Sequence, residues 1–148
     1  FDVSSHFANG AKVKVVNGTD YLGEFTVASG NVDVSAVQTI SSAQIGFDFN
    51  VEAQTLPIDA QVQGGPLTGE PRAVSRVVVD LIDTLSLSVN NKKLIIRQVT
   101  DDFSVARTAV SGKREFRLLG YSKDPVVTIT QTAPLSLQVN GIIAEVSF

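Results

Sequence analysis

The stretch AVSRVVVDLIDTLSLSV, residues 73–89, decides the fold class. Its odd-numbered positions from 77 onward are apolar with one exception, Asp83, whereas its even-numbered positions are mixed and then wholly polar. Side chains of a β-strand alternate between two faces, so this period of two predicts one long strand, or two collinear strands, covering a hydrophobic core. The chain is therefore expected to build its core from β-sheets.

Asp83 interrupts the apolar face of this stretch. Either a bulge or bend turns its carboxylate outward, or the carboxylate pairs with a buried cation. The bulge is the favoured interpretation, because burying an unpaired carboxylate is very costly.

The closing stretch PLSLQVNGIIAEVSF, residues 134–148, changes the parity of its apolar positions at Asn140-Gly141. Leu135 and Val139 are odd-numbered, whereas Ile142 and Val146 are even-numbered. A two-residue type I′ loop at Asn140-Gly141 would place Val139 opposite Ile142 and bring all the apolar side chains to one face. A bulge in one continuous strand would also change the parity, so both interpretations stay open.

The first fifty residues predict a smaller module. Val13 and Val15 alternate with Lys12 and Lys14 and lead into the turn VNGTD, and further apolar alternation in 25–27 and 32–34 predicts a three-strand meander with a four-residue loop over 28–31. The segment 45–51 predicts another half-buried strand. The phenylalanines on apolar strand faces, which are expected to be core residues, are Phe25, Phe47, Phe49 and Phe116.

Together these patterns predict an all-β chain. A small N-terminal β module, meander-like or barrel-like, occupies residues 1–52 and is joined to an antiparallel β-sandwich or barrel over residues 53–148. Residues 57–72 form a long Gly/Pro-rich loop, and loops of this length are usually functional, flexible or bridging. The segment 92–98 predicts a strand, and 99–112 fits a loop, a short strand or one helical turn.

Composition excludes several classes of function. The net charge is −3 and the pI is about 5.0, which argues against a dedicated nucleic-acid binder. The charge is uneven, because residues 1–71 hold two lysines and eight acidic residues, whereas residues 72–148 hold ten basic and seven acidic ones. With no cysteine, the chain has no disulfide and no thiolate metal site. No apolar run approaches the roughly 20 residues of a membrane span, so no membrane insertion by this segment is expected.

Catalytic chemistry is sparse in the sequence. His6 is the single histidine, and SSHFANG lacks the strand–elbow–helix context of an activated serine. Asp101-Asp102 fits a polar turn. No phosphate-binding loop, dinucleotide fingerprint or calcium-loop spacing occurs. We expect no enzymatic activity, no catalytic residue, no metal or other cofactor, and no small-molecule substrate.

Three stretches resemble the tail nozzle family, also called tail tubular protein B, of short-tailed phages and prophages. They are residues 8–27 (ANGAKVKVVNGTDYLGEFTV), residues 55–89 and residues 112–148. The family has a TLP step, a Gly-rich loop and an SRV strand in the second stretch. The third stretch matches the closing pattern of the family at Gly112, Arg114, Asp124, Thr128, Ile129, Gln131, Pro134, Leu135, Glu145 and Val146. The family often has proline where this chain has Ser136, and it commonly has Leu-Gly in place of Asn140-Gly141. The family pattern at this second position would also suit one kinked strand.

The resemblance implies a structural component of a phage virion. Nozzle proteins are several times longer, so this chain, which begins at Phe1 without an initiator Met, would be their C-terminal part. It implies a homohexameric ring in the virion tail, made in the host cytoplasm, with the tail adaptor and fibre as neighbours. DNA would pass through the ring without specific binding.

Loop length and charge suggest where such a subunit contacts its neighbours. The candidate interface residues are Gln61, Gly64, Gly65, Glu70 and Arg72 in the loop, and Lys92 and Lys93 at an exposed edge. The alternative function is an extracellular carbohydrate-binding or adhesion module, although the chain has no Trp and only two Tyr. A third hypothesis, a hydrolase of cell-wall glycans, would depend on a single Asp or Glu.

Overall fold

The computed structural model describes residues 1–58, 61–62, 65–66 and 70–147, and these residues form strands and no helix. The predicted all-β class is confirmed: the fold is sandwich-like, with antiparallel sheets, none of them closed into a barrel. The strands are β1 (Lys12–Asn17), β2 (Asp20–Thr26), β3 (Gln44–Phe47), β4 (Val51–Gln54), β5 (Gln61–Val62), β6 (Gly65–Pro66), β7 (Ala73–Thr84), β8 (Ser88–Val89), β9 (Lys92–Lys93), β10 (Val110–Arg117), β11 (Thr128–Gln131) and β12 (Val139–Ser147).

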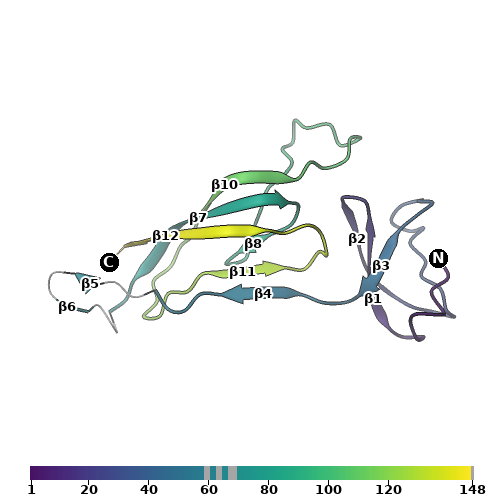
Figure 1. Cartoon of the computed structure of the whole chain (residues 1–148), viewed down its shortest axis with the longest axis horizontal. Helices are drawn as coiled ribbons and strands as arrows, with labels where there is room; N and C mark the ends of the chain where they lie inside the picture. The colour runs from purple at the N-terminus through teal and green to yellow at the C-terminus, as the bar shows by residue number, and fades with distance from the viewer. Residues whose placement is uncertain (59–60, 63–64, 67–69, 148) are drawn as a thin grey trace.

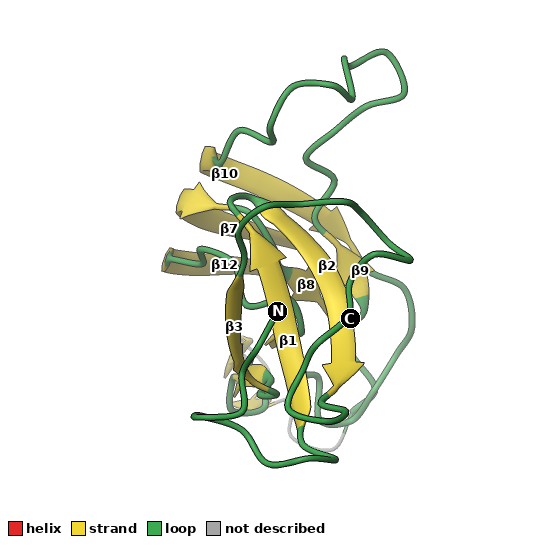
Figure 2. Cartoon of the chain, turned by 90° about the vertical axis from the view of Figure 1, so that its right-hand side faces the viewer, coloured by secondary structure: helices red, strands yellow, loops and turns green. Residues whose placement is uncertain are grey.

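The N-terminal residues form a three-stranded sheet in the order β2-β1-β3, with β1 in the centre (Figures 1 and 2). The predicted turn between β1 and β2 is confirmed, since Asn17 pairs with Asp20 around Gly18-Thr19. One face of this sheet covers a core of its own. The buried residues of that core are Val3, Val13, Val15, Val27, Val32 and Val34.

The prediction that residues 32–34 form the third strand of the meander is wrong. Ala28 and Asn31 exchange backbone hydrogen bonds around Ser29-Gly30, which both have positive φ, so the loop is a two-residue turn rather than a four-residue one. Residues 32–34 then form no strand, because the N–H of Val32 donates to the carbonyl of Phe1 instead (2.9 Å). The third strand is β3, on the other edge of β1.

The predicted strand over 45–51 divides into two strands in different sheets. β3 ends at Phe47 and pairs with β1, whereas β4 begins at Val51 and pairs with β11. Phe47 and Phe49 were expected in the core but are 68% and 56% exposed, because the chain crosses between the sheets at this point. Phe116 is buried as expected, and Phe25 packs against the N-terminal core.

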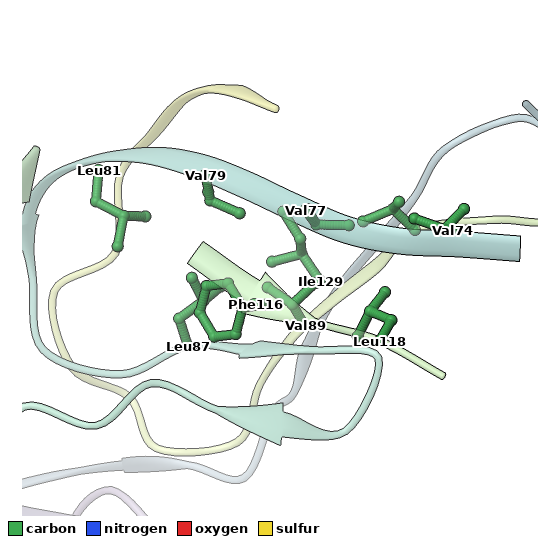
Figure 3. Close-up of a cluster of buried hydrophobic side chains, with 10 residues drawn as sticks. Val74, Val77, Val79, Leu81, Leu87, Val89, Phe116, Leu118 and Ile129 are labelled. Atoms are coloured by element: carbon green, nitrogen blue, oxygen red, sulfur yellow. The ribbon is translucent and has the colours of Figure 1, made fainter. Parts of the chain in front are cut away.

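The remaining strands form a sandwich of a three-stranded sheet, β10-β7-β12, and a four-stranded sheet, β4-β11-β8-β9 (Figure 1). Side chains of β7 point across the gap toward β8 and β11 (Figure 3). The buried residues of this second core are Val74, Val77, Val79, Leu81, Leu87, Val89, Phe116, Leu118, Val127 and Ile129. The alternation in residues 73–89 therefore does mark the strands that cover the core.

Asp83 sits in a bulge, as the favoured interpretation predicted. Its φ is +42° and its side chain is exposed, while the pairing of β7 with β10 shifts register between Leu81 and Thr84. The Ser111 hydroxyl accepts a hydrogen bond from the Asp83 N–H (3.0 Å). The chain then leaves this sheet and enters the other one as β8, so the 73–89 stretch is two strands in two layers rather than one plane.

The hairpin interpretation of Asn140-Gly141 is wrong, and the alternative of one bulged strand is confirmed. β12 runs continuously along β7, with Val139 opposite Leu81 and Gly141 opposite Asp80, so the extra residue between them changes the parity. A type I′ turn needs positive φ at both loop residues, and neither Asn140 nor Gly141 has it.

Two further segments differ from expectation. The loop over 57–72 contains a short ladder, in which β5 pairs with β6. The strand expected over 92–98 is limited to β9, and residues 94–109 form neither strand nor helix (Figure 1). Of the alternatives left open for 99–112, the loop is confirmed up to residue 109, and β10 begins at Val110.

Replacing Leu81 with Ala tests whether the sandwich core stabilises the whole chain. Leu81 is fully buried between the sheets, so the substitution is expected to lower the free energy of unfolding by about 2–5 kcal/mol in urea titrations. The control is Ile143→Ala on the exposed face of β12, which is expected to change it by less than about 0.5 kcal/mol. Equal effects would contradict the assignment of the core.

Candidate functional site

Four of the five candidate interface residues in the 57–72 loop lie among the described residues. Gln61 and Gly65 belong to the β5–β6 ladder, Glu70 is exposed, and Gly64 lies outside the described residues. Figure 1 places this ladder at the end of the sandwich opposite the N-terminal sheet. The β5–β6 ladder thus lies away from the first module.

Arg72, the last of the candidate interface residues in this loop, is buried in the chain, with only 2% of it exposed. Its backbone exchanges two hydrogen bonds of 2.8 Å with Ser122, and its guanidinium Nη2 donates to the carbonyl of Lys123 (2.9 Å). These contacts fix the end of the 57–72 loop to the segment after β10. The structure therefore gives Arg72 an internal, anchoring role.

Lys92 and Lys93 are exposed and form the edge strand β9. They follow a two-residue turn, because Val89 pairs with Lys92 and both Asn90 and Asn91 have positive φ. The side chain of Asn90 holds this turn in place by accepting a hydrogen bond from the Thr128 N–H (2.7 Å). Asn tolerates this backbone conformation better than most residues, so the NN pair is the local signal that positions the two lysines.

A groove lies between this edge and β10. We call it the basic edge groove, and its volume is about 260 Å³. Its lining residues are Lys92, Lys93, Leu94, Ile95, Arg114, Glu115, Phe116 and Arg117. No pattern in the sequence connects Arg114 and Arg117 with the two lysines, because their proximity depends on how the two sheets stack.

A second polar centre joins the N-terminal sheet to the sandwich at the junction of the two modules. Lys14 lies on β1 and is only 4% exposed. Its ammonium donates to the carbonyls of Phe49 (2.6 Å) and Thr132 (2.7 Å) and to the side-chain oxygen of Asn50 (2.9 Å), and it pairs with Asp48 (2.8 Å). Thr132 directly follows β11, so this one side chain links the N-terminal sheet, the crossing segment and the sandwich.

A cavity of about 460 Å³ opens beside this junction. Tyr21 from the first module lines it together with Ser86, Phe103 and Arg107 from the second. Burial raises the pKa of the Tyr21 hydroxyl above its ordinary value. An ion pair between Arg107 and Asp20 (3.1 Å) connects the two modules at the same place.

The segment 94–109 that borders this cavity is organised around Arg97. The guanidinium donates to the carbonyls of Phe103 (3.4 Å) and Val105 and lies 5.5 Å from the centre of the Phe103 ring. Asp102 accepts hydrogen bonds from the hydroxyl (2.6 Å) and the N–H (2.8 Å) of Ser104, which lower the pKa of its carboxyl. Asp101 accepts from the N–H of Gln98 (2.8 Å), in keeping with the polar turn predicted here.

The lone histidine takes part in a local contact. His6 is exposed, and its Nδ1 lies 2.7 Å from the hydroxyl of Ser5, its neighbour in the same turn. Among the described residues, no group of three or more His, Cys, Asp or Glu side chains could hold a metal ion. That part of the chain also contains no helix long and apolar enough to span a membrane.

Comparison with known proteins adds no identification. Neither a scan against protein-family models nor a search of curated proteins finds a match to this chain.

The Lys14 centre can be tested by substitution. Lys14→Met removes the donor of three hydrogen bonds and leaves buried acceptors unpaired, so it is expected to lower the free energy of unfolding by roughly 2–4 kcal/mol. It should also speed proteolytic cleavage between Phe47 and Val51.

The matched control is Lys12→Met, two residues earlier on the same strand. Lys12 is largely exposed and pairs with Glu24 at the surface (2.9 Å), so its replacement should leave the urea midpoint nearly unchanged. A Lys14 variant as stable as the Lys12 variant, with unchanged cleavage, would contradict the role assigned to Lys14.

Proposed function

We propose that this chain is a structural component of a phage virion tail, the C-terminal part of a nozzle subunit. The collinear resemblance of residues 8–27, 55–89 and 112–148 supports the proposal. The observation that carries it in the structure is the Lys14 centre, which holds two β modules in one fixed arrangement. Six copies would form a ring that contacts the tail adaptor and fibre.

The sheet edges fit this role. Within the described residues, β10 and β12 each pair with β7 on one side only, so each leaves one edge open to a neighbouring subunit. A ring is built by heterologous contacts, in which one surface of a subunit meets a different surface of the next. A net charge of −3 suits passage of DNA, because phosphate contacts by basic residues supply most non-specific affinity.

The mass in solution of the longest natural chain that contains these residues tests the proposal. Light scattering after size exclusion is expected to give a hexamer, or a monomer that forms a ring when the portal–adaptor complex is added. A matched chain that lacks residues 1–148 shows whether they take part in assembly. A chain that stays monomeric and never joins a tail would overturn the proposal.

A second candidate function is binding of carbohydrate by an extracellular adhesion module. The junction cavity favours it, since Tyr21 and Phe103 line it beside the hydroxyls of Ser86 and Ser88. Aromatic faces with a few polar groups are typical of small-ligand sites. Titration with a panel of glycans would separate the two functions, and binding that Tyr21→Ala abolishes would favour adhesion.

A further inference from the structure

We propose that the basic edge groove binds an acidic polypeptide segment in extended conformation, which adds as a strand to the open edge of β10. This inference goes beyond the structural role proposed above and does not depend on it. It rests on three properties of the groove: its charge, its unpaired backbone and its apolar floor.

The charge is concentrated and largely uncompensated. Four basic side chains line the groove against one carboxylate, Glu115, in a chain whose net charge is −3. That carboxylate is already shared between Arg117 (3.1 Å) and Arg76 (3.7 Å). Within the described part of the chain, Lys92, Lys93 and Arg114 form no ion pair. Their charges are therefore available to a partner, and the expected partner is acidic.

The backbone of β10 provides the second property. β10 is eight residues long and pairs with β7, while its other edge has no partner strand among the described residues. An extended peptide can pair with such an edge through main-chain hydrogen bonds, and pockets beside it then select alternate side chains. The cations beside this edge select for carboxylates at those positions.

The groove floor favours a polypeptide over a nucleic acid. Leu94 and Phe116 contribute apolar surface, and Ile95 beside them is 78% exposed. Phe116 is the only aromatic residue in the lining, and it is 7% exposed, so it offers no ring face for stacking of bases. A strand that alternates carboxylates with aliphatic side chains matches both the cations and the floor.

The test uses a fluorescein-labelled octapeptide of alternating Glu and Val, with fluorescence anisotropy as the readout, on the full chain at roughly 0.15 M salt, where charges are screened beyond about 8 Å. Saturable binding is expected, and the double variant K93E/R114E should weaken it by at least about tenfold. The control is Lys113→Glu, which is compared with R114E alone because these two single variants carry the same charge change; Lys113 is next to Arg114 on β10 but lies outside the groove lining. It should weaken binding by less than about threefold, since its effect is long-range and screened.

Further probes separate strand addition from attraction to any polyanion. The same peptide with N-methyl groups on alternate residues should lose binding, because it cannot complete the main-chain ladder. An octapeptide of alternating Gln and Val should bind weakly. Urea midpoints and far-UV circular dichroism of each variant establish that it folds, as expected for substitutions of exposed side chains.

Three results with the peptide would overturn the proposal. They are the absence of saturable binding, equal weakening by the Lys113 control, and unchanged affinity after N-methylation. A single-stranded DNA octamer that binds as tightly as the peptide would also overturn it, in favour of a general phosphate-binding surface.

Discussion

The ammonium of Lys14 is the point at which the two halves of the molecule depend on each other. β1 is the central strand of the first sheet, and one of its faces covers the N-terminal core, while Lys14 points from the other face into the junction. A buried ammonium is tolerated only when its donors are satisfied, and here the carbonyls of Phe49 and Thr132 accept from it while Asp48 supplies the opposite charge. These acceptors come from the crossing segment and from the end of β11, so satisfying one charge fixes three segments at once. A module pair held by apolar contact alone could slide, whereas a point charge with three hydrogen bonds has one favourable geometry.

Alternation of side chains predicted most of the sandwich, and the errors share one physical cause. Where the period of two is regular, as from Val77 to Leu81, the predicted inward face is the buried one. Where the period breaks, a bulge, a turn and a change of sheet produce the same pattern in the sequence. Asp83 and Asn140 both mark bulges against β7. The bulge at Asp83 could be predicted because burying a carboxylate is costly. At Asn140 no local feature of the sequence distinguishes a bulge from a turn, because the deciding contacts are with Val79 and Leu81, some sixty residues earlier.

The same distinction between local and distant contacts explains which features of the candidate site could be predicted from the sequence. Lys92 and Lys93 follow polar turn residues, and their exposure could be predicted. Their proximity to Arg114 could not, since it depends on the stacking of β9 over β10. The sequence predicts that Lys14 and Lys12 share the polar face of β1, and the structure confirms this alternation. No pattern in the sequence indicates that a second module covers Lys14 on that face. Arg72 is the reverse case: it was a candidate for contact with a partner, but it is buried against Ser122 and Lys123, about fifty residues away in the sequence.

The two open edges beside β7 differ in chemistry, and this difference limits how copies of the chain can meet. The β10 edge carries Lys113, Arg114 and Arg117, so two β10 edges brought together would place like charges opposite each other. The β12 edge exposes Ile143 but contains the Asn140 bulge, which interrupts the ladder that a second strand would follow. Neither edge therefore favours isologous pairing, in which it would meet the same edge of a second copy. An acidic strand removes the repulsion at β10 and uses the same cations that exclude self-pairing, so the charges of the groove act both to reject one partner and to select another.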